Sequence, residues 1–265
     1  MIVAVTGGKG GVGKSTVAHN LGYELDAVVI DGDLAKADLP SGRGPDLHDV
    51  LAGRADPMDA VQRLGAVRML PCGDTLEGAF AADMARFPEA VERVARECGT
   101  VVIDCPAGLA RDVGVQLDCA DVAVLVTTPD RTALLNAYRT KEVALEFDTP
   151  VASAVLNRAA SGGDAGPDAS GETATPFTRA SDTLERVLQR DEGTEPRENG
   201  TSDIEDRLAA PTTVIEERPA VAASQARGRP LGEFEPTNPA VEAFARLART
   251  VEHAGRRQRT VPDAG

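Results

Sequence analysis

The chain reads Gly8-Lys9-Gly10-Gly11-Val12-Gly13-Lys14-Ser15-Thr16 just after the apolar run Ile2-Val3-Ala4-Val5-Thr6. Glycines let such a loop curl until successive backbone N–H groups point inward at phosphate oxygens. In the spacing Gly-x4-Gly-Lys-Ser, Lys14 reaches the terminal phosphates and the Ser15 hydroxyl ligates Mg²⁺. The sequence therefore predicts a phosphate-binding loop between a strand and a helix whose positive end faces the anion.

The residues after the loop fit the helix that such a site requires. Val17, Leu21 and Leu25 recur at helical spacing and form one apolar face. The competing interpretation is a glycine-rich turn that binds nothing, and the order of strand, loop and helix argues against it. We therefore predict that the nucleotide is bound by Gly8, Lys9, Gly10, Gly11, Val12, Gly13, Lys14, Ser15 and Thr16.

Lys9 is an unusual residue at its place in the loop. The chain has four lysines, and two of them, Lys9 and Lys14, lie here, whereas the basic side chains elsewhere are nearly all arginine. A lysine offers a compact and flexible point charge rather than a planar fork. We interpret Lys9 as a second phosphate-directed cation, with a solvated loop charge as the alternative.

The run Lys9–Thr16 resembles the deviant Walker A loop of the MinD/ParA family of P-loop ATPases. In that family the first lysine crosses to the phosphates of the partner subunit, and two protomers enclose two ATP molecules. The resemblance implies that this chain binds ATP with Mg²⁺ and forms a homodimer when ATP is bound. It also implies slow, partner-stimulated ATP hydrolysis in which Lys9 and Lys14 act as catalytic residues.

Short apolar runs alternate with helical patterns along the chain, which favours an α/β fold. We predict a single-domain P-loop NTPase with a mostly parallel twisted sheet and helices on both faces. The predicted helices after the first are Phe87–Cys98, Thr132–Phe147 and one capped by Asn238. The predicted strands are Ile2–Thr6, Ala27–Asp31, Val67–Pro71, Val101–Asp104, Val122–Pro129, Val151–Leu156 and Thr212–Ile215.

The composition changes in the second half of the chain. Residues 159–207 are rich in Gly, Pro, Ser, Thr and acidic residues, which cannot bury enough surface to offset their ordering entropy. We predict an acidic flexible insert there, with one short helix at 181–189. The ATPase domain would comprise residues 1–158 and 208–254, the part that the resemblance covers, and residues 255–265 would form a basic disordered tail.

Carboxylates follow two of the predicted strands, at the edge where ligands bind in open α/β sheets. Asp104 closes an apolar run and precedes Cys105-Pro106-Ala107-Gly108, as in a Walker B strand whose carboxylate holds Mg²⁺ through a water. This segment is also similar to switch II of MinD relatives. Ser15, Asp31 and Asp104 are the predicted metal residues, and a simple turn is the alternative at each strand end.

The segment Asp31-Gly32-Asp33-Leu34 resembles switch I of the same family, in which the second aspartate positions the attacking water. The resemblance therefore makes Asp33 the candidate for that role and gives Asp31 a part in the metal shell. Asp38 matches a further acidic position of that segment. Because Asp and Gly after a strand often form only a turn, a structural role remains the competing interpretation.

Asn157 ends the strand 151–156 at the same edge of the sheet. An amide offers a donor and an acceptor, which suits the edge of an adenine. The resemblance to the family implies an adenine-contacting asparagine here, and a turn residue is the alternative. The loop 216–218 would flank the base.

The net charge of the chain disfavours some classes of binding partner. The chain has 42 acidic and 28 basic residues, a net charge of −14, which repels nucleic acid and anionic membranes. Few lysines, many arginines and few aromatics are typical of a proteome adapted to high salt, as in a halophilic archaeon. The terminal arginines near 256–259 lack an apolar face, so membrane attachment is predicted to be weak or absent.

The cysteines do not indicate a metal cluster. Cys72, Cys98, Cys105 and Cys119 form no Cys-x-x-Cys pair, and no group of histidines accompanies them. They are interpreted as reduced thiols of a cytoplasmic protein. A cluster shared across a dimer interface stays open on spacing alone.

Three function classes follow. The leading one is a MinD-like ATPase, an ATP-dependent dimerising switch that positions or regulates other proteins through an unidentified partner or activator. The alternatives are a ParA-like DNA-partitioning ATPase and a metabolic or cluster-carrier enzyme of the same superfamily.

Overall fold

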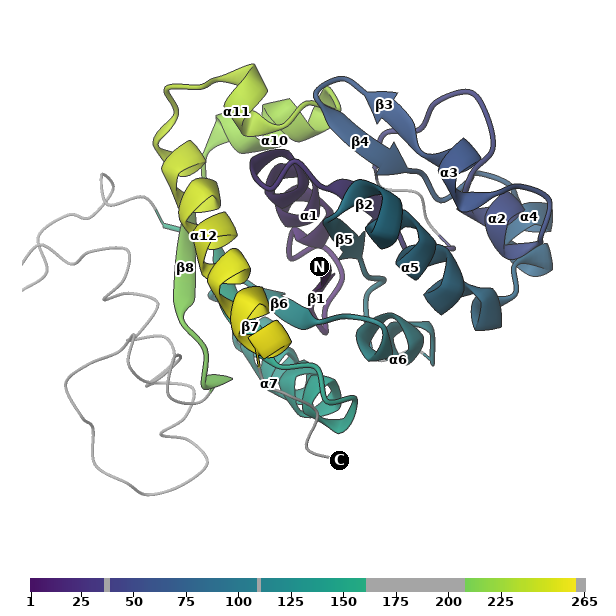
Figure 1. Cartoon of the computed structure of the whole chain (residues 1–265). Coiled ribbons are helices and arrows are strands. Elements are labelled where there is room, and N and C mark those ends of the chain that lie inside the picture. Colours follow the sequence, from purple (N-terminus) through teal and green to yellow (C-terminus); the bar gives the residue numbers. More distant parts are fainter. Residues whose placement is uncertain (36–38, 109–110, 161–207, 261–265) are drawn as a thin grey trace, which may run out of the picture.

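The computed structural model describes residues 1–35, 39–108, 111–160 and 208–260. Eight strands form one sheet in the order β3-β4-β2-β5-β1-β6-β7-β8, and all neighbours are parallel except β3 and β4. This confirms the predicted fold class, a mostly parallel α/β sheet (Figure 1). The strands are β1 Ile2–Thr6, β2 Val28–Asp31, β3 Gln62–Leu64, β4 Val67–Leu70, β5 Val101–Asp104, β6 Val122–Thr127, β7 Val151–Ala159 and β8 Thr212–Glu216.

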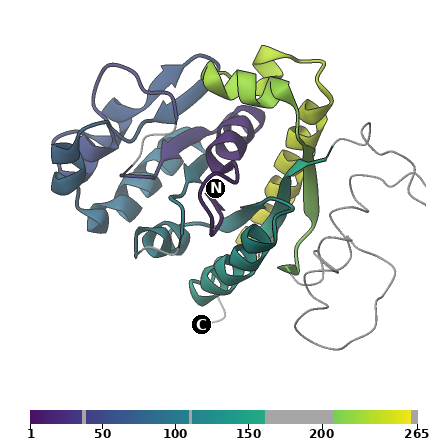
Figure 2. The ribbon, with the colours of Figure 1, turned by 180° about the vertical axis from the view of Figure 1, so that it is seen from behind.

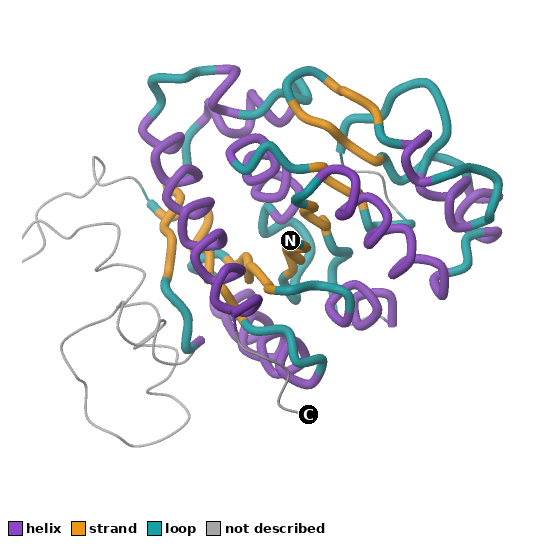
Figure 3. Tube along the Cα trace, in the orientation of Figure 1, coloured by secondary structure: helices purple, strands orange, loops and turns teal. Residues whose placement is uncertain are grey.

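Helices cover both faces of the sheet (Figure 3). The helix α12 lies in front of the strands in Figure 1 and behind them in Figure 2, and it packs beside α1. The helical elements are α1 Lys14–Glu24, α2 Leu47–Leu51, α3 Pro57–Ala60, α4 Leu76–Ala81, η1 Met84–Arg86, α5 Phe87–Cys98, α6 Arg111–Asp118, α7 Arg131–Glu146, α10 Pro219–Ala226, α11 Leu231–Phe234 and α12 Pro239–Thr260.

Alternation along each central strand explains why both faces are covered. In β2, Val28 and Ile30 join the core under α5, whereas Val29 joins the core under α1 and α12. Successive strand residues point to opposite faces, so a strand buried on both sides is apolar throughout. The carboxyl ends of the parallel strands then meet at one edge, where the loop after β1 and the aspartates lie.

The helix α12 is longer than predicted. The side chain of Asn238 accepts a hydrogen bond from the backbone N–H of Ala240 at 3.0 Å, which fits the predicted cap. However, the helix continues to Thr260, so the prediction of a disordered segment from residue 255 is wrong as far as 260. Gly255 is buried and packs against Met1, which extends the contact of the helix with the sheet.

Other predictions concern residues that the structure does not describe. Residues 261–265, and the predicted insert 159–207 with its helix at 181–189, lie outside the described residues apart from positions 159 and 160. Ala159 belongs to β7, so the strand extends beyond the predicted end of the first segment. None of the helices that the structure describes combines the length and the apolar character needed to cross a bilayer.

His19 on α1 predicts a pH dependence of stability. It is buried against the core, and this burial lowers its pKa to about 4 despite the nearby Glu233 carboxylate. Between pH 4 and 6.5, His19 binds a proton in the unfolded chain but not in the folded chain. The contribution of His19 to the free energy of unfolding is therefore complete above pH 6.5 and falls as the pH falls. We expect His19 to account for a loss of about 3 kcal/mol over that range.

Urea unfolding of the chain and of His19→Leu at several pH values measures this loss. The free-energy difference between the two proteins should change over the stated window, because other titrating groups act equally on both. A difference that does not vary with pH would contradict the assignment.

Candidate functional site

The loop between β1 and α1 has the backbone that a phosphate-binding loop requires. Gly11 and Gly13 have φ angles of 77° and 100°, in the left-handed region that favours glycine. Gly13 is the N-cap of α1 and supplies no side-chain cap, so the first N–H groups of the helix lack the usual side-chain acceptor. This arrangement suits an anion at the helix start.

Close neighbours also demand glycine in this loop. A Cβ atom on Gly13 would overlap Nδ2 of Asn157, and one on Gly8 would lie 2.7 Å from Cβ of Asn136. The loop is therefore held between the end of β7 and the helix α7. Substituted side chains there would displace the loop itself.

Lys14 carries a buried charge at the base of the loop. Its side chain is only 8% exposed, and within the described part of the chain it forms no ion pair with a carboxylate. A buried ammonium group destabilises the fold unless an anion lies beside it. Its position at the first residue of α1 fits the predicted contact with terminal phosphates.

Two carboxylates face each other beside this loop. Asp31 at the end of β2 and Asp104 at the end of β5 are register partners, and they are 1% and 2% exposed. Burial, and then the Asp104 carboxylate, raise the pKa of Asp31 to about 8. A divalent cation would stabilise both groups as carboxylates. Their oxygens, like the hydroxyl of the half-buried Ser15, are the type of ligand that Mg²⁺ prefers.

Asp33 follows in the same loop and is partly exposed. Its backbone N–H donates to Oδ1 of Asp31 at 3.4 Å, and its own Oδ1 accepts from the N–H of Ala35 at 3.3 Å. The structure thus brings Asp31 and Asp33 together in one turn after β2. Asp38 lies outside the described residues.

Lys9 does not point into the phosphate loop. Its Nζ forms an ion pair of 2.9 Å with Oδ1 of Asp130 in the same chain, and both side chains are largely exposed. Asp130 also caps α7 by accepting from the N–H of Ala133. The contact with Lys9, and then this capping bond, lower the pKa of Asp130. Asp130 was not predicted as a site residue, because its sequence context indicates only a helix cap.

Asn157 joins the loop to a cavity beside it. Its Nδ2 donates to the Val12 carbonyl at 2.8 Å, so one donor of the predicted adenine-contacting amide is used within the protein. The cavity has a volume of about 510 Å³ and includes Thr16, the residue after Ser15. Its other lining residues are Asn157, Arg158, Glu216, Glu217, Arg218, Pro219, Val221, Ala222, Gln225 and Ala226.

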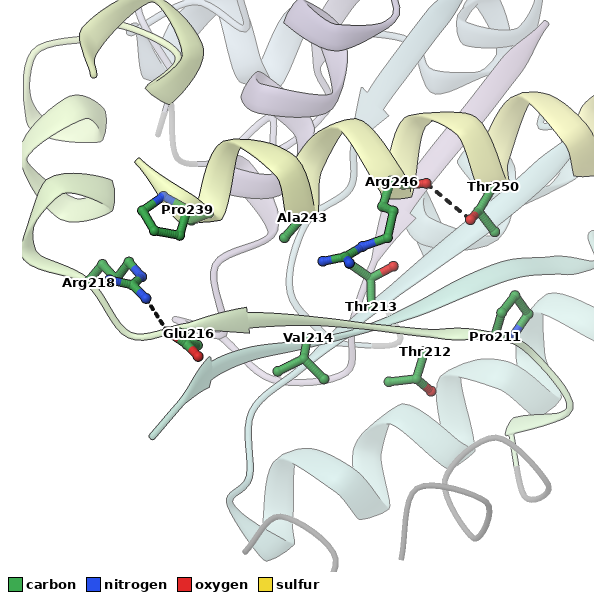
Figure 4. A pocket seen from close by; sticks show the side chains of 11 residues that line it. Pro211, Thr212, Thr213, Val214, Glu216, Arg218, Pro239, Ala243, Arg246 and Thr250 are labelled. Atoms are coloured by element: carbon green, nitrogen blue, oxygen red, sulfur yellow. Dashed lines mark hydrogen bonds and ion pairs between the residues drawn. The ribbon is translucent and has the colours of Figure 1, made fainter. Parts of the chain in front are cut away.

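A second cavity of about 530 Å³ lies between β8 and α12 (Figure 4). Arg246 and Thr250 of α12 face the strand across it, and Arg218 forms an ion pair with Glu216 at its end. No residue of the loop 8–16 lines this cavity. The cavity beside Asn157 is therefore the better candidate for the base of a nucleotide.

The cysteines are free thiols in the structure. Cys72 and Cys105 are buried, and burial raises the pKa of both. Over the described ranges, no group of three or more His, Cys, Asp or Glu side chains has an arrangement suited to a metal ion. The Mg²⁺ site considered above has two carboxylates, and nucleotide phosphates and water supply the remaining ligands in such sites.

Comparisons with known proteins agree with this geometry. An uncharacterized ATP-binding protein of Methanocaldococcus jannaschii is 38% identical over 169 residues, 60% of this chain and 64% of that protein. The septum site-determining protein MinD of Bacillus subtilis is 30% identical over 152 residues, 52% of this chain and 56% of that protein. The chain therefore spans less than two thirds of the length of these two relatives.

Solved structures match over nearly the whole chain. The cell division ATPase MinD of Pyrococcus furiosus has a TM-score of 0.74 at 28% identity, covering 95% of this chain and 98% of that one. MinD of Pyrococcus horikoshii, solved complexed with Mg-ADP, has a TM-score of 0.74 at 25% identity, covering 98% and 99%. A family model, the CobQ/CobB/MinD/ParA nucleotide binding domain, matches residues 3–231. The chain belongs to this family of nucleotide-binding domains.

Proposed function

We propose that this chain is a MinD-like ATPase, an ATP-dependent switch that positions or regulates other proteins. One observation carries the proposal most directly: the buried Lys14, which has no carboxylate ion pair among the described residues, lies at the start of α1, beside a glycine loop and two buried carboxylates. Mg-ADP in the P. horikoshii MinD structure and the ATP-binding relative support ATP and Mg²⁺ as its ligands.

Each part of the site has a proposed role. The loop 8–16 and Lys14 bind the phosphates, and the cavity beside Asn157 takes the base. Ser15, Asp31 and Asp104 hold Mg²⁺, which would neutralise charge on the phosphates when bound. Asp33 orients the water that attacks the γ-phosphate, so that ATP and water give ADP and phosphate.

We propose that ATP binding at this site causes the chain to dimerise. Lys9 would leave Asp130 and reach the phosphates of a second copy, which links nucleotide binding to assembly. The acidic surface disfavours nucleic acid as a partner, and a protein partner or activator is expected instead. A cytoplasmic setting with weak or no membrane attachment fits the same charge.

Phosphate release from ATP tests the proposal, with assays in molar KCl because of the acidic surface. The unsubstituted chain should release phosphate, and Asp33→Ala should do so about 100-fold more slowly while binding ATP with similar affinity. Asp26→Ala, a substitution of an exposed aspartate before β2, is the matched control and should keep the normal rate. Equal rates for the chain and Asp33→Ala would contradict the role of Asp33, and no release by the chain itself would contradict the proposal.

A further inference from the structure

The loop after β2 is held at three consecutive backbone carbonyls by three side chains. Each carbonyl oxygen accepts one hydrogen bond from a different part of the fold. The carbonyls belong to Gly32, Asp33 and Leu34, and their donors are, in that order, Gln116 at 2.8 Å, Cys72 at 3.2 Å and His48 at 3.2 Å.

The three donors come from separate elements and are all buried. Gln116 lies on α6, Cys72 follows β4, and His48 lies on α2. Gln116 and Cys72 are 0% exposed and His48 is 2% exposed. Buried hydrogen bonds hold their geometry better than exposed ones, since water does not compete for the partners.

Two of the three donors lie next to each other. A carbonyl oxygen only accepts, so the contact of His48 with Leu34 is a hydrogen bond in the tautomer that carries the proton on Nε2. Sγ of Cys72 lies 3.4 Å from the same Nε2, so the thiol and the imidazole stand side by side under the loop. Burial also raises the pKa of Cys72, which keeps its thiol protonated as a donor.

The backbone of Gly32 is also held by a second contact. Gly32 donates its N–H to the Asp104 carbonyl at 3.0 Å, so the loop is tied to the end of β5 as well. A Cβ atom on Gly32 would lie 2.7 Å from Nε2 of Gln116. The backbone that precedes Asp33 is thus fixed by α6 and β5 together.

We propose that Gln116, Cys72 and His48 are positioning residues that fix the Asp33 carboxylate for the attack of water on ATP. This inference rests on the role proposed above for Asp33. The three side chains do not touch the reacting atoms in this scheme, and they act only through the backbone of residues 32–34. Small displacements of a catalytic group lower rates strongly, whereas the affinity for ATP depends on the phosphate loop.

The hydrogen bond from Gln116 to Gly32 also links two parts of the fold. Gln116 lies on α6, which follows the segment that begins at Asp104, so one side chain joins the loop after β2 to the first helix after β5. A shift of α6 would therefore be passed to Gly32 and on to Asp33. This makes Gln116 the donor whose loss should affect hydrolysis most.

The test is single-turnover hydrolysis of ATP by Gln116→Met, Cys72→Ala and His48→Leu, in the full chain. We expect each rate to fall at least about 10-fold, with the largest fall in Gln116→Met, and the dissociation constant for ATP to change less than about 3-fold. Cys72→Ser and His48→Gln keep a donor at the same place and should recover most of the rate. In the Asp33→Ala background, Gln116→Met should change the rate less than about 2-fold, because both act through one group.

Ser153→Ala is the matched control. Ser153 on β7 is also 0% exposed, and its hydroxyl donates to the Pro211 carbonyl at 2.9 Å, away from the loop and from α6. This variant should lose a buried hydrogen bond without loss of rate. Equal rate losses in Ser153→Ala and Gln116→Met, or a full further loss in the Asp33→Ala background, would overturn the positioning role.

Hydrogen exchange of nucleotide-free protein separates this inference from the proposed function. Amides of residues 32–35 should exchange faster in Gln116→Met and Cys72→Ala than in the unsubstituted chain. Unchanged exchange would show that the side chains do not hold the loop, and would overturn the inference. A chain that hydrolyses no ATP would instead overturn the proposed function, whatever the exchange result.

Discussion

Replacing Lys14 by methionine is expected to abolish the binding of Mg·ATP while leaving the protein folded. Methionine keeps the length of the side chain but removes the buried charge, so the terminal phosphates lose their counter-ion. We expect the affinity to fall at least ~100-fold, about 3 kcal/mol. Thermal unfolding measures this, because a bound ligand raises Tm and the variant should show no rise at saturating Mg·ATP.

The same experiment separates lost binding from lost folding. Without nucleotide, Lys14→Met should be at least as stable as the unsubstituted chain, since it removes a buried charge that forms no ion pair with the residues that the structure describes. Lys141→Ala, at a lysine on α7 outside the loop, is the control and should keep the full rise in Tm. A normal rise in Lys14→Met would show that the loop does not bind phosphates through this residue.

Replacing Lys9 by alanine is expected to separate nucleotide binding from dimerisation. Lys9 is largely exposed and contacts Asp130 rather than the loop interior, so its loss should change ATP affinity by less than about 5-fold. The ATP-dependent dimer should disappear, because the cross-subunit contact with phosphate would be missing. Light scattering after size exclusion, in an Asp33→Ala background that retains ATP, measures the mass directly.

Asp130→Asn provides the comparison for this experiment. It removes the partner that holds Lys9 within its own chain, and it keeps the shape of the capping side chain of α7. We expect it to dimerise at the same or a lower ATP concentration than the unsubstituted chain. A normal ATP-dependent dimer in Lys9→Ala would show that the cross-subunit role is wrong.

The central sheet could be predicted because its strands are buried on both faces. Apolar runs such as Val101–Asp104 leave no other assignment, and α5 was predicted with its observed bounds because a full helical face was present. The elements between β2 and β4 were missed. β3 has three residues, and α2 has five, so neither spans enough sequence to show a period.

The candidate site was predictable only where local sequence fixes the geometry. The loop 8–16 was predicted by its glycine and lysine spacing, and Asp31 and Asp104 by their places at strand ends. The contacts of Gln116 with Gly32 and of Lys9 with Asp130 join residues 84 and 121 positions apart. Such contacts depend on how α6 and α7 pack against the sheet, and no local pattern encodes them.

Calorimetric titration of Mg·ATP into the purified chain tests the central claim most directly. A site built from a glycine loop, the buried Lys14 and two carboxylates should bind one nucleotide per chain, with saturable heat that depends on Mg²⁺. Heat that does not change on removal of Mg²⁺ would contradict the assigned metal residues. The absence of any binding heat for a nucleoside triphosphate, with the protein shown to be folded, would contradict the account as a whole.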